Sequence, residues 1–307
     1  MKNLLAIFAM ALLAIARPVI AAESLQIVVM DPLSKEIACA CVKGYAQRNY
    51  KVLAAFLQQK LGVEVKIAHG ENLATALKES GGAADLIIGK SSVVLCEARN
   101  HKLDVTPVAR LTDKFGSPYQ QGWIVVRKET AATKLSDLAG WRIIFGPEDC
   151  DEKSAAPITL LKDAGVTIPD KLETAPSCSA AAEALMKLAP DAKAAAVISS
   201  YAEPLLSGCG TVKAGDLRVI GKTKDVAFIT AFASKSLSKE RLKALSEALL
   251  DTGGDHQLLQ AIESSIGFIE LEETAVPKKT GALKPWNQFR GANRDGTADW
   301  LPVTLPK

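Results

Sequence analysis

Polar side chains that could bind a small molecule gather in short segments, most of which follow an apolar, strand-like run. The residues predicted to contact a ligand are Ser91, Ser92, Tyr119, Asp149, Asp151, Ser154, Ser199 and Tyr201. Hydroxyl groups can donate to an anion or accept from a cation, whereas carboxylates accept only. In open α/β sheets, ligands bind at the carboxyl ends of the strands. The pattern therefore predicts a binding cleft built from these segments.

Several of these residues have a second, purely structural interpretation. Asp149, Asp151 and Glu152 precede an expected helix, where they could cap it and offset its dipole by about 0.3–1 kcal/mol each. Ser91 or Ser92 could likewise cap a helix, and either tyrosine could pack in a core or a hinge. Lysines at 43 and 90 could neutralise an anion or lie exposed on the surface. The sequence leaves both interpretations open.

The chain has six cysteines, and five of them fall in or beside the same segments. They are Cys39, Cys41, Cys96, Cys150, Cys178 and Cys209. An even number in an exported protein predicts three disulfides, although spacing does not fix their pairing. Cys150 with Cys178, and Cys39 or Cys41 with Cys96, are the pairs that converging loops would favour. The alternative is a metal-handling or redox protein with free thiols, but scattered histidines and the lack of a Cys-x-x-Cys pair predict no metal and no cofactor.

Strand-like and helix-like segments alternate along most of the chain. Leu25–Met30 is an apolar run typical of a buried parallel strand, and residues 45–61 then show helical spacing of apolar residues. Residues 85–89 (DLIIG) form a third such strand after a second helix. Further on, Gly122–Arg127 and Arg142–Phe145 read as strands, and a helix follows at about 154–164. This alternation predicts an α/β fold with parallel-rich sheets.

Residues 121–166 carry the clearest likeness to a known family. They read QGWIVVRKETAATKLSDLAGWRIIFGPEDCDEKSAAPITLLKDAGV, which is a strand, a polar turn, a short helix, a second strand, a Gly-Pro loop and a helix. This layout resembles the phosphonate-binding branch of the periplasmic solute-binding proteins of type 2, grouped with sulfonate binders and transferrin.

The resemblance implies a two-lobe clamshell with a central cleft. Lobe 1 would comprise residues 23–115 plus 225–276, and lobe 2 residues 119–222. A small-molecule ligand would be captured in the cleft and delivered to a membrane ABC permease or a sensor. No catalytic residue is implied, and the protein is predicted not to be an enzyme.

The loop before the helix at 154–164 departs from the resembled family. There, phosphonate binders are expected to hold the ligand with hydroxyl groups and free backbone N–H groups at the helix start. When the sequences are matched on Pro157 to Leu161, those hydroxyl positions become Cys150, Asp151 and Glu152. Carboxylates repel an anion, so the sequence predicts an acidic, Cys-rich cleft and argues against phosphonate as the ligand.

The two ends of the chain carry separate signals. Residues 1–21 combine Lys2, an apolar core and a small-residue cleavage site, which is typical of a signal peptide and predicts a periplasmic or secreted protein that is not membrane-embedded. Residues 277–307 form a Lys/Pro/Gly-rich linker and a tail. In that tail, residues 286–296 (WNQFRGANRDG) resemble the opening of quinoprotein-type β-propellers. An adaptor domain of a quinoprotein-like assembly is therefore an alternative function.

Composition excludes one further class of function. The net charge is +3, with acids and bases mixed along the chain and aromatic residues at only 5%. Nucleic-acid binding needs a basic patch and, for single strands, stacking aromatics. The sequence shows neither, nor a nucleophile elbow or phosphate-binding glycine loop.

Overall fold

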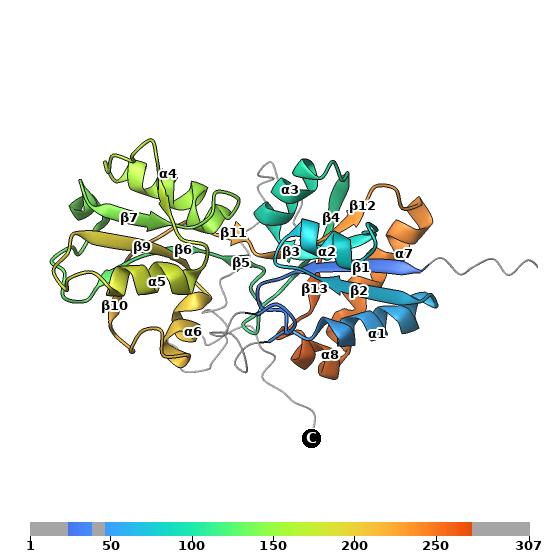
Figure 1. The fold of residues 1–307 in the computed structure, drawn as a ribbon. Helices are drawn as coiled ribbons and strands as arrows, with labels where there is room; N and C mark the ends of the chain where they lie inside the picture. Colours follow the sequence, from blue (N-terminus) through green and yellow to red (C-terminus); the bar gives the residue numbers. More distant parts are fainter. Residues whose placement is uncertain (1–23, 39–46, 272–307) are drawn as a thin grey trace, which may run out of the picture. The chain divides into compact units, whose positions relative to one another are not determined.

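A computed structural model describes residues 24–38 and 47–271, which form two α/β lobes (Figure 1). The predicted signal peptide, the tail and the segment containing Cys39, Cys41 and Lys43 therefore lie outside the described residues. The predicted α/β fold with two lobes is confirmed. In the part of the chain that the structure describes, no helix is both long enough and apolar enough to span a bilayer.

Lobe 1 is built on a six-stranded sheet in the order β13-β4-β12-β3-β1-β2. Its strands are β1 (Leu25–Met30), β2 (Val65–His69), β3 (Leu86–Lys90), β4 (Val105–Leu111), β12 (Ile229–Ser234) and β13 (Phe268–Ile269). β1 pairs in parallel with both β2 and β3, whereas β12 runs antiparallel to β3 and β4. Every residue of β1 is buried, as a central strand covered on both faces requires.

Helices cover both faces of this sheet. They are α1 (Tyr50–Leu61), α2 (Leu73–Glu79), α3 (Ser91–Asn100), α7 (Lys239–Leu250) and α8 (His256–Ala261), with a short 3₁₀ helix η3 (Asp251–Gly254). Ile27 and Val29 pack with residues of α1, α7 and α8, and Val28 and Met30 pack with α2 and α3. The alternation of side chains along a strand explains this division.

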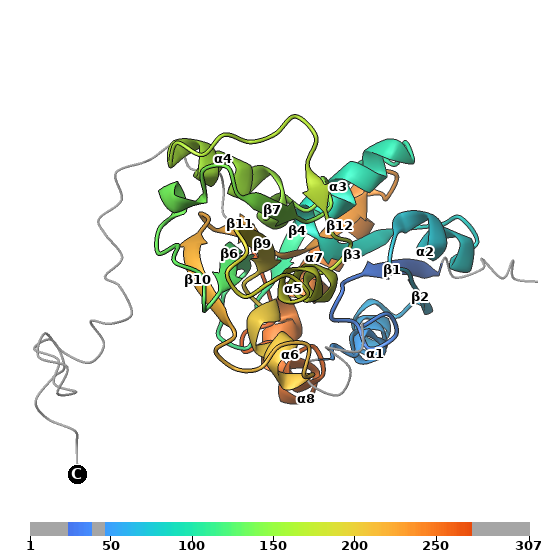
Figure 2. The same cartoon turned by 60° about the vertical axis from the view of Figure 1, so that its left-hand side comes forward.

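Lobe 2 has a five-stranded sheet in the order β10-β6-β9-β7-β8. Its strands are β6 (Gly122–Arg127), β7 (Arg142–Phe145), β8 (Glu173–Thr174), β9 (Ala194–Ser199) and β10 (Leu217–Lys222). Its helices are α4 (Ala155–Asp163), α5 (Cys178–Met186) and α6 (Ala202–Gly208), with 3₁₀ turns η1 (Leu135–Leu138) and η2 (Asp151–Lys153). β7 is parallel to β8 and β9, while β6 and β10 add antiparallel strands. Figures 1 and 2 show α4 on one face of the sheet and α5 with α6 on the other.

The chain crosses between the lobes twice, and the two crossings are bonded to each other. β5 (Tyr119–Gln120) lies on the outgoing crossing and β11 (Val226–Ala227) on the return. They pair antiparallel, with Tyr119 opposite Ala227 and Gln120 opposite Val226. Arg110 at the end of β4 donates to the Tyr119 hydroxyl at 3.1 Å. A short two-stranded ribbon therefore joins the lobes.

Candidate ligand-binding site

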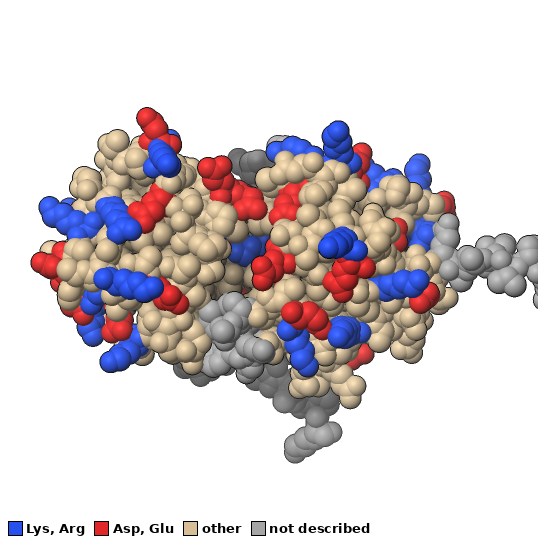
Figure 3. All heavy atoms as spheres, in the orientation of Figure 1, with Lys and Arg blue, Asp and Glu red and all other residues tan. Residues whose placement is uncertain are grey.

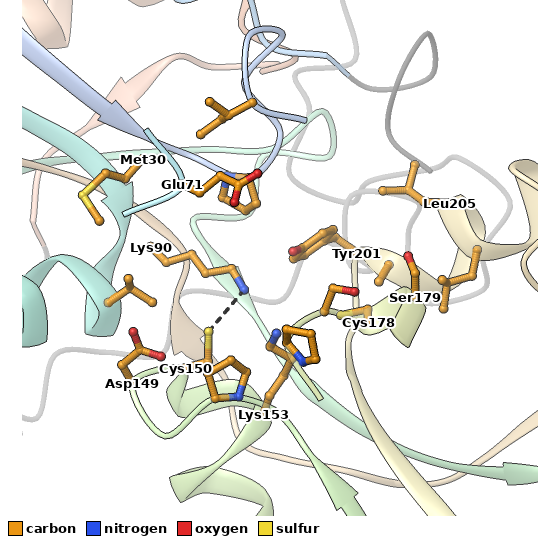
Figure 4. Close-up of a pocket in the computed structure, with 18 of the residues that line it drawn as sticks. Met30, Glu71, Lys90, Asp149, Cys150, Lys153, Cys178, Ser179, Tyr201 and Leu205 are labelled. Carbon is orange, nitrogen blue, oxygen red and sulfur yellow. Dashed lines mark hydrogen bonds between the residues drawn. The ribbon is translucent and has the colours of Figure 1, made fainter. Parts of the chain in front are cut away.

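A cavity of about 420 Å³ lies between the lobes, as the hollow in Figure 3 shows. Its walls come from the segments that follow β1, β2 and β3 in lobe 1 and β7, β8 and β9 in lobe 2. Val93 and Glu97 of α3 line it. Figure 4 labels other lining residues, among them Met30, Glu71, Lys90, Asp149, Cys150, Lys153, Cys178, Tyr201 and Leu205. All six strands belong to the parallel parts of the sheets, so their carboxyl ends meet at this place.

A buried ion pair joins the lobes beside the cavity. Lys90 ends β3, and its ammonium lies 2.5 Å from a carboxylate oxygen of Glu152 in η2. The two side chains are 7% and 1% exposed. The hydroxyl of Ser199 donates to the same oxygen at 2.7 Å. Lys90 also lies 5.4 Å from the ring centroid of Tyr201, which stacks on Phe228.

Mutual contact keeps both members of this pair charged. Burial alone would raise the pKa of Glu152, but Lys90, Lys153 and the donated hydrogen bonds outweigh it and lower that pKa. Burial alone would lower the pKa of Lys90, yet the nearby Glu152 raises it well above its usual range. The pair is therefore ionised throughout the neutral range.

The carboxylate of Glu152 occupies the groups that could otherwise bind an anionic ligand. The ammonium of Lys90 and the hydroxyl of Ser199 both point at its carboxylate. Glu152 occupies one of the three positions at which the family resemblance implies hydroxyl groups. The donors nearest this carboxylate are consequently engaged before any ligand arrives.

Ser92 makes a second bridge between the lobes. Its hydroxyl donates to the backbone carbonyl of Asp149 at 2.7 Å and accepts from the backbone N–H of Asp151 at 3.1 Å. Ser92 belongs to α3, and the two aspartates belong to the loop after β7. In the structure, Ser92 therefore contacts the opposite lobe directly.

The structure brings only part of the predicted site residues to the cavity. Asp149 and Tyr201 line it. Ser199 lies behind Glu152, and Ser154 is buried at the start of α4. The remaining predicted residues, Ser91, Ser92, Tyr119 and Asp151, lie at lobe-to-lobe contacts or in the crossing. Ser91 begins α3, and its backbone N–H bonds the carbonyl of Phe228 at 2.9 Å.

Several cavity residues were not among the predicted contacts. Lys153, Glu71, Glu97 and the start of α5 at residues 177–179 all line the cavity. Their one shared signal in the sequence is position, since each lies in the loop or the first two helical turns after a strand. Lys153 is the least expected, because the acidic residues before it make the loop look exposed. The turn η2 instead buries both Glu152 and Lys153.

The disulfides expected among the described cysteines are not formed. Cys96, Cys150 and Cys178 are free thiols. The Cys150 sulfur faces the ammonium of Lys90 at 3.8 Å, whereas the Cys178 sulfur accepts from the backbone N–H of Ser199 at 3.4 Å. The two sulfurs thus have different partners, and a Cys150–Cys178 bond is absent. Burial raises the pKa of Cys150, although Lys90 opposes this effect.

No metal site is present among the residues described. Within residues 24–38 and 47–271, no group of three or more histidine, cysteine, aspartate or glutamate side chains is arranged to hold a metal ion.

A family model shows what class of protein this is. The model, described as "ABC transporter, phosphonate, periplasmic substrate-binding protein", matches residues 44–275. The chain therefore belongs to this family of periplasmic binding proteins, which serve ABC transporters as substrate-binding components rather than enzymes. The resemblance to the phosphonate-binding branch is confirmed. A search of curated proteins found no match to the chain.

Solved structures share the fold at low sequence identity. PhnD1 from Prochlorococcus marinus, in complex with methylphosphonate, is 17% identical with a TM-score of 0.60, over 81% of this chain and 93% of that one. The binding protein component of an ABC phosphonate transporter from Pseudomonas aeruginosa is 15% identical with a TM-score of 0.60, over 81% of each chain. A Xanthomonas citri protein bound to ATP is 14% identical with a TM-score of 0.61, over 82% and 92%. At these identities the likeness establishes the fold and not the ligand.

Proposed function

We propose that this protein captures a small solute in the cavity between its lobes and delivers it to an ABC permease after export to the periplasm. The observation that supports this most directly is the position of the cavity. Loops at the carboxyl ends of parallel strands from both lobes line it, and hydrogen bonds between the lobes lie beside it. Family membership supports the transport role.

The solute is a compound other than a simple phosphonate held by Lys90. Glu152 already fills the space next to Lys90 and Ser199 with a carboxylate. A phosphonate placed there would lie against that carboxylate at a site of low dielectric, where like charges repel strongly. The ligand therefore occupies the remaining volume, beside the ion pair and not in place of it.

A variant that fills the cavity tests the proposal. Val93 on α3 lines the cavity, and Leu95 on the same helix is 44% exposed. We expect Val93→Trp to abolish solute binding, because the larger ring occupies the ligand volume, and Leu95→Trp to leave it intact. Thermal shift and calorimetry with a panel of amino acids, sugars, polyamines and phosphonates would provide the readout. A solute that binds equally well to both variants would contradict a ligand site in this cavity.

One observation favours a second candidate function, the binding of a soft metal ion. Free thiols of Cys150 and Cys178 both line the cavity, and thiolates are the ligands that soft cations such as Cu(I) prefer. The raised pKa of Cys150 opposes this role, because metal binding requires the thiolate. Native mass spectrometry distinguishes metal binding from solute capture. A metal ion that the unmodified protein retains and Cys150→Ser loses would favour metal handling.

A further inference from the structure

One lysine that faces the cavity is near Glu152, which its charge helps to keep ionised, but makes no close ion pair with it. Lys153 is 4% exposed, yet its ammonium takes part in no ion pair or hydrogen bond with the described residues. Figure 4 shows this side chain reaching from the loop after β7 into the cavity. An unpaired buried ammonium is costly. Its position therefore indicates that an anionic group completes the site.

The backbone holds Lys153 in place. Its aliphatic stem lies against Gly146, where an added Cβ would come within 3.0 Å of the Lys153 Cδ and Cε atoms. The backbone N–H of Gly146 donates to the carbonyl of Lys153 at 3.0 Å. Only a residue without a side chain at 146 allows this path. The ammonium is thus presented by a constrained turn.

Lys90 does not compete for the same anion. Its charge is balanced by Glu152 at 2.5 Å. The start of α5 adds to the positive wall instead, because residues 177–179 line the cavity and a helix N-terminus favours negative charge. Ser177 caps this nine-residue helix by accepting from the N–H of Ala180 at 3.1 Å.

Other walls of the cavity carry the opposite charge. Glu71 and Glu97 from lobe 1 and Asp149 from lobe 2 all line it. Figure 3 shows acidic side chains around the hollow between the lobes and basic atoms inside it. An anion alone would meet these carboxylates unfavourably, whereas a molecule that also carries a cation would match both regions.

We infer that the cavity takes a small zwitterion, whose anionic group binds the ammonium of Lys153 beside the start of α5 and whose cationic group meets Glu71, Glu97 and Asp149. The inference rests on the proposed capture of a solute in this cavity and adds the class of that solute. Glu152 would keep the anionic group away from Lys90, so that Lys153 and the start of α5 select it.

Three probes of equal chain length test the charges separately. Calorimetry would compare 5-aminopentanoate with pentanoate and pentylamine on the unmodified protein. We expect 5-aminopentanoate to bind more tightly than either, because only it satisfies both charged regions. Equal binding of pentylamine would overturn the role of Lys153, and equal binding of pentanoate would overturn the role of the carboxylates. This comparison needs no variant, so it stands even if a variant fails to fold.

Charge variants then locate the anionic group. We expect Lys153→Met to lower the affinity for 5-aminopentanoate by about tenfold or more, because a desolvated ion pair is lost. Lys153→Arg should retain most of the affinity. Lys162→Met, on an exposed position of α4, is the matched control and should change nothing. Unchanged binding to Lys153→Met would overturn the inference.

The outcome also separates this inference from the proposed function. If none of the probes binds, but another solute binds to the unmodified protein and not to Val93→Trp, the zwitterion is wrong and solute capture stands. If no solute distinguishes Val93→Trp from Leu95→Trp, the proposed function fails as well.

Discussion

At the scale of single residues, the ion pair between Lys90 and Glu152 is a feature with a large energetic consequence. Removing one partner of such a pair leaves a buried charge unbalanced and costs about 3–5 kcal/mol, whereas replacing both with apolar residues is often tolerated. The pair is therefore better understood as a constraint on what the cavity accepts than as a source of stability.

Its titration gives a testable pH dependence. Because the pKa of folded Glu152 lies below its ordinary value of 4.5, the stabilisation from its charge is present above pH 4.5 and is lost as the pH falls through the folded pKa. We expect Glu152→Gln to lower the free energy of unfolding by about 3–5 kcal/mol at neutral pH and by less in acid. Urea unfolding across this pH range measures the difference in the free energy of unfolding between the unmodified protein and Glu152→Gln, with the exposed Glu148→Gln as control. A difference that stays constant as the pH falls into the acid range would contradict a lowered pKa for Glu152.

The thiols should differ in reactivity for a related reason. Cys150 is 6% exposed and its pKa is raised by burial, whereas Cys96 on α3 is partly exposed. Alkylation requires an accessible thiolate. We expect iodoacetamide at neutral pH to modify Cys96 well before Cys150, as peptide mass spectrometry would show. The denatured protein, where both thiols should react alike, is the control, and early modification of native Cys150 would contradict its burial.

At the scale of elements, the short turn η2 determines the chemistry of the cavity. It carries Glu152 to the ion pair and Lys153 to the cavity wall, and it is packed against two glycines. A Cβ at Gly122 would collide with the backbone carbonyl of Glu152, and one at Gly146 would collide with the stem of Lys153. The turn can therefore keep this position only if the residues that it contacts, Gly122 at the start of β6 and Gly146 after β7, have no side chain.

Substitution at Gly122 tests this dependence. We expect Gly122→Ala to lower the free energy of unfolding by about 1–3 kcal/mol, the range for overpacking, and to weaken ligand binding because η2 must move. Gly254→Ala is the matched control, since a Cβ there meets no atom within 4 Å and its φ is not positive. Equal stability of the two variants, measured by urea unfolding, would show that η2 adapts without cost.

Local pattern predicted the elements well but could not predict this turn. The apolar runs at Leu25–Met30, Gly122–Arg127 and Arg142–Phe145 are strands with those bounds. Burial of Glu152 depends instead on Lys90, which lies 62 positions earlier in the chain. No neighbouring residue signals such a partner. The sequence of the acidic loop therefore indicates an exposed helix cap, whereas the fold buries Glu152 against the other lobe.

At the scale of the whole molecule, both apolar and polar side chains hold the lobes near each other. Tyr201 and Leu205 of lobe 2 pack against the core of lobe 1, where Tyr201 stacks on Phe228. The ion pair is one such contact, and the two hydrogen bonds of Ser92 form another. Hydrogen bonds of this kind contribute about 0.5–1.5 kcal/mol each. Their sum is comparable to the energy that separates open and closed forms of hinged proteins.

Loss of the Ser92 bridge should therefore change how far apart the lobes stay. We expect Ser92→Ala without ligand to have a larger radius of gyration by small-angle X-ray scattering, because both hydrogen bonds are lost and open forms gain population. Ser91→Ala changes a neighbouring hydroxyl that takes no part in the bridge, and it should scatter like the unmodified protein. Identical curves for all three proteins would show that Ser92 does not influence closure.

The pairing of β5 with β11 has a consequence for how such motion can be followed. Two separate connections would let the lobes bend and rotate independently, giving several degrees of freedom. Because Tyr119 and Gln120 are bonded across to Ala227 and Val226, the two connections resist twisting and share one bending axis. We therefore expect bending about this ribbon to dominate the relative motion, so one pair of fluorescent labels, one on each lobe, would follow most of it.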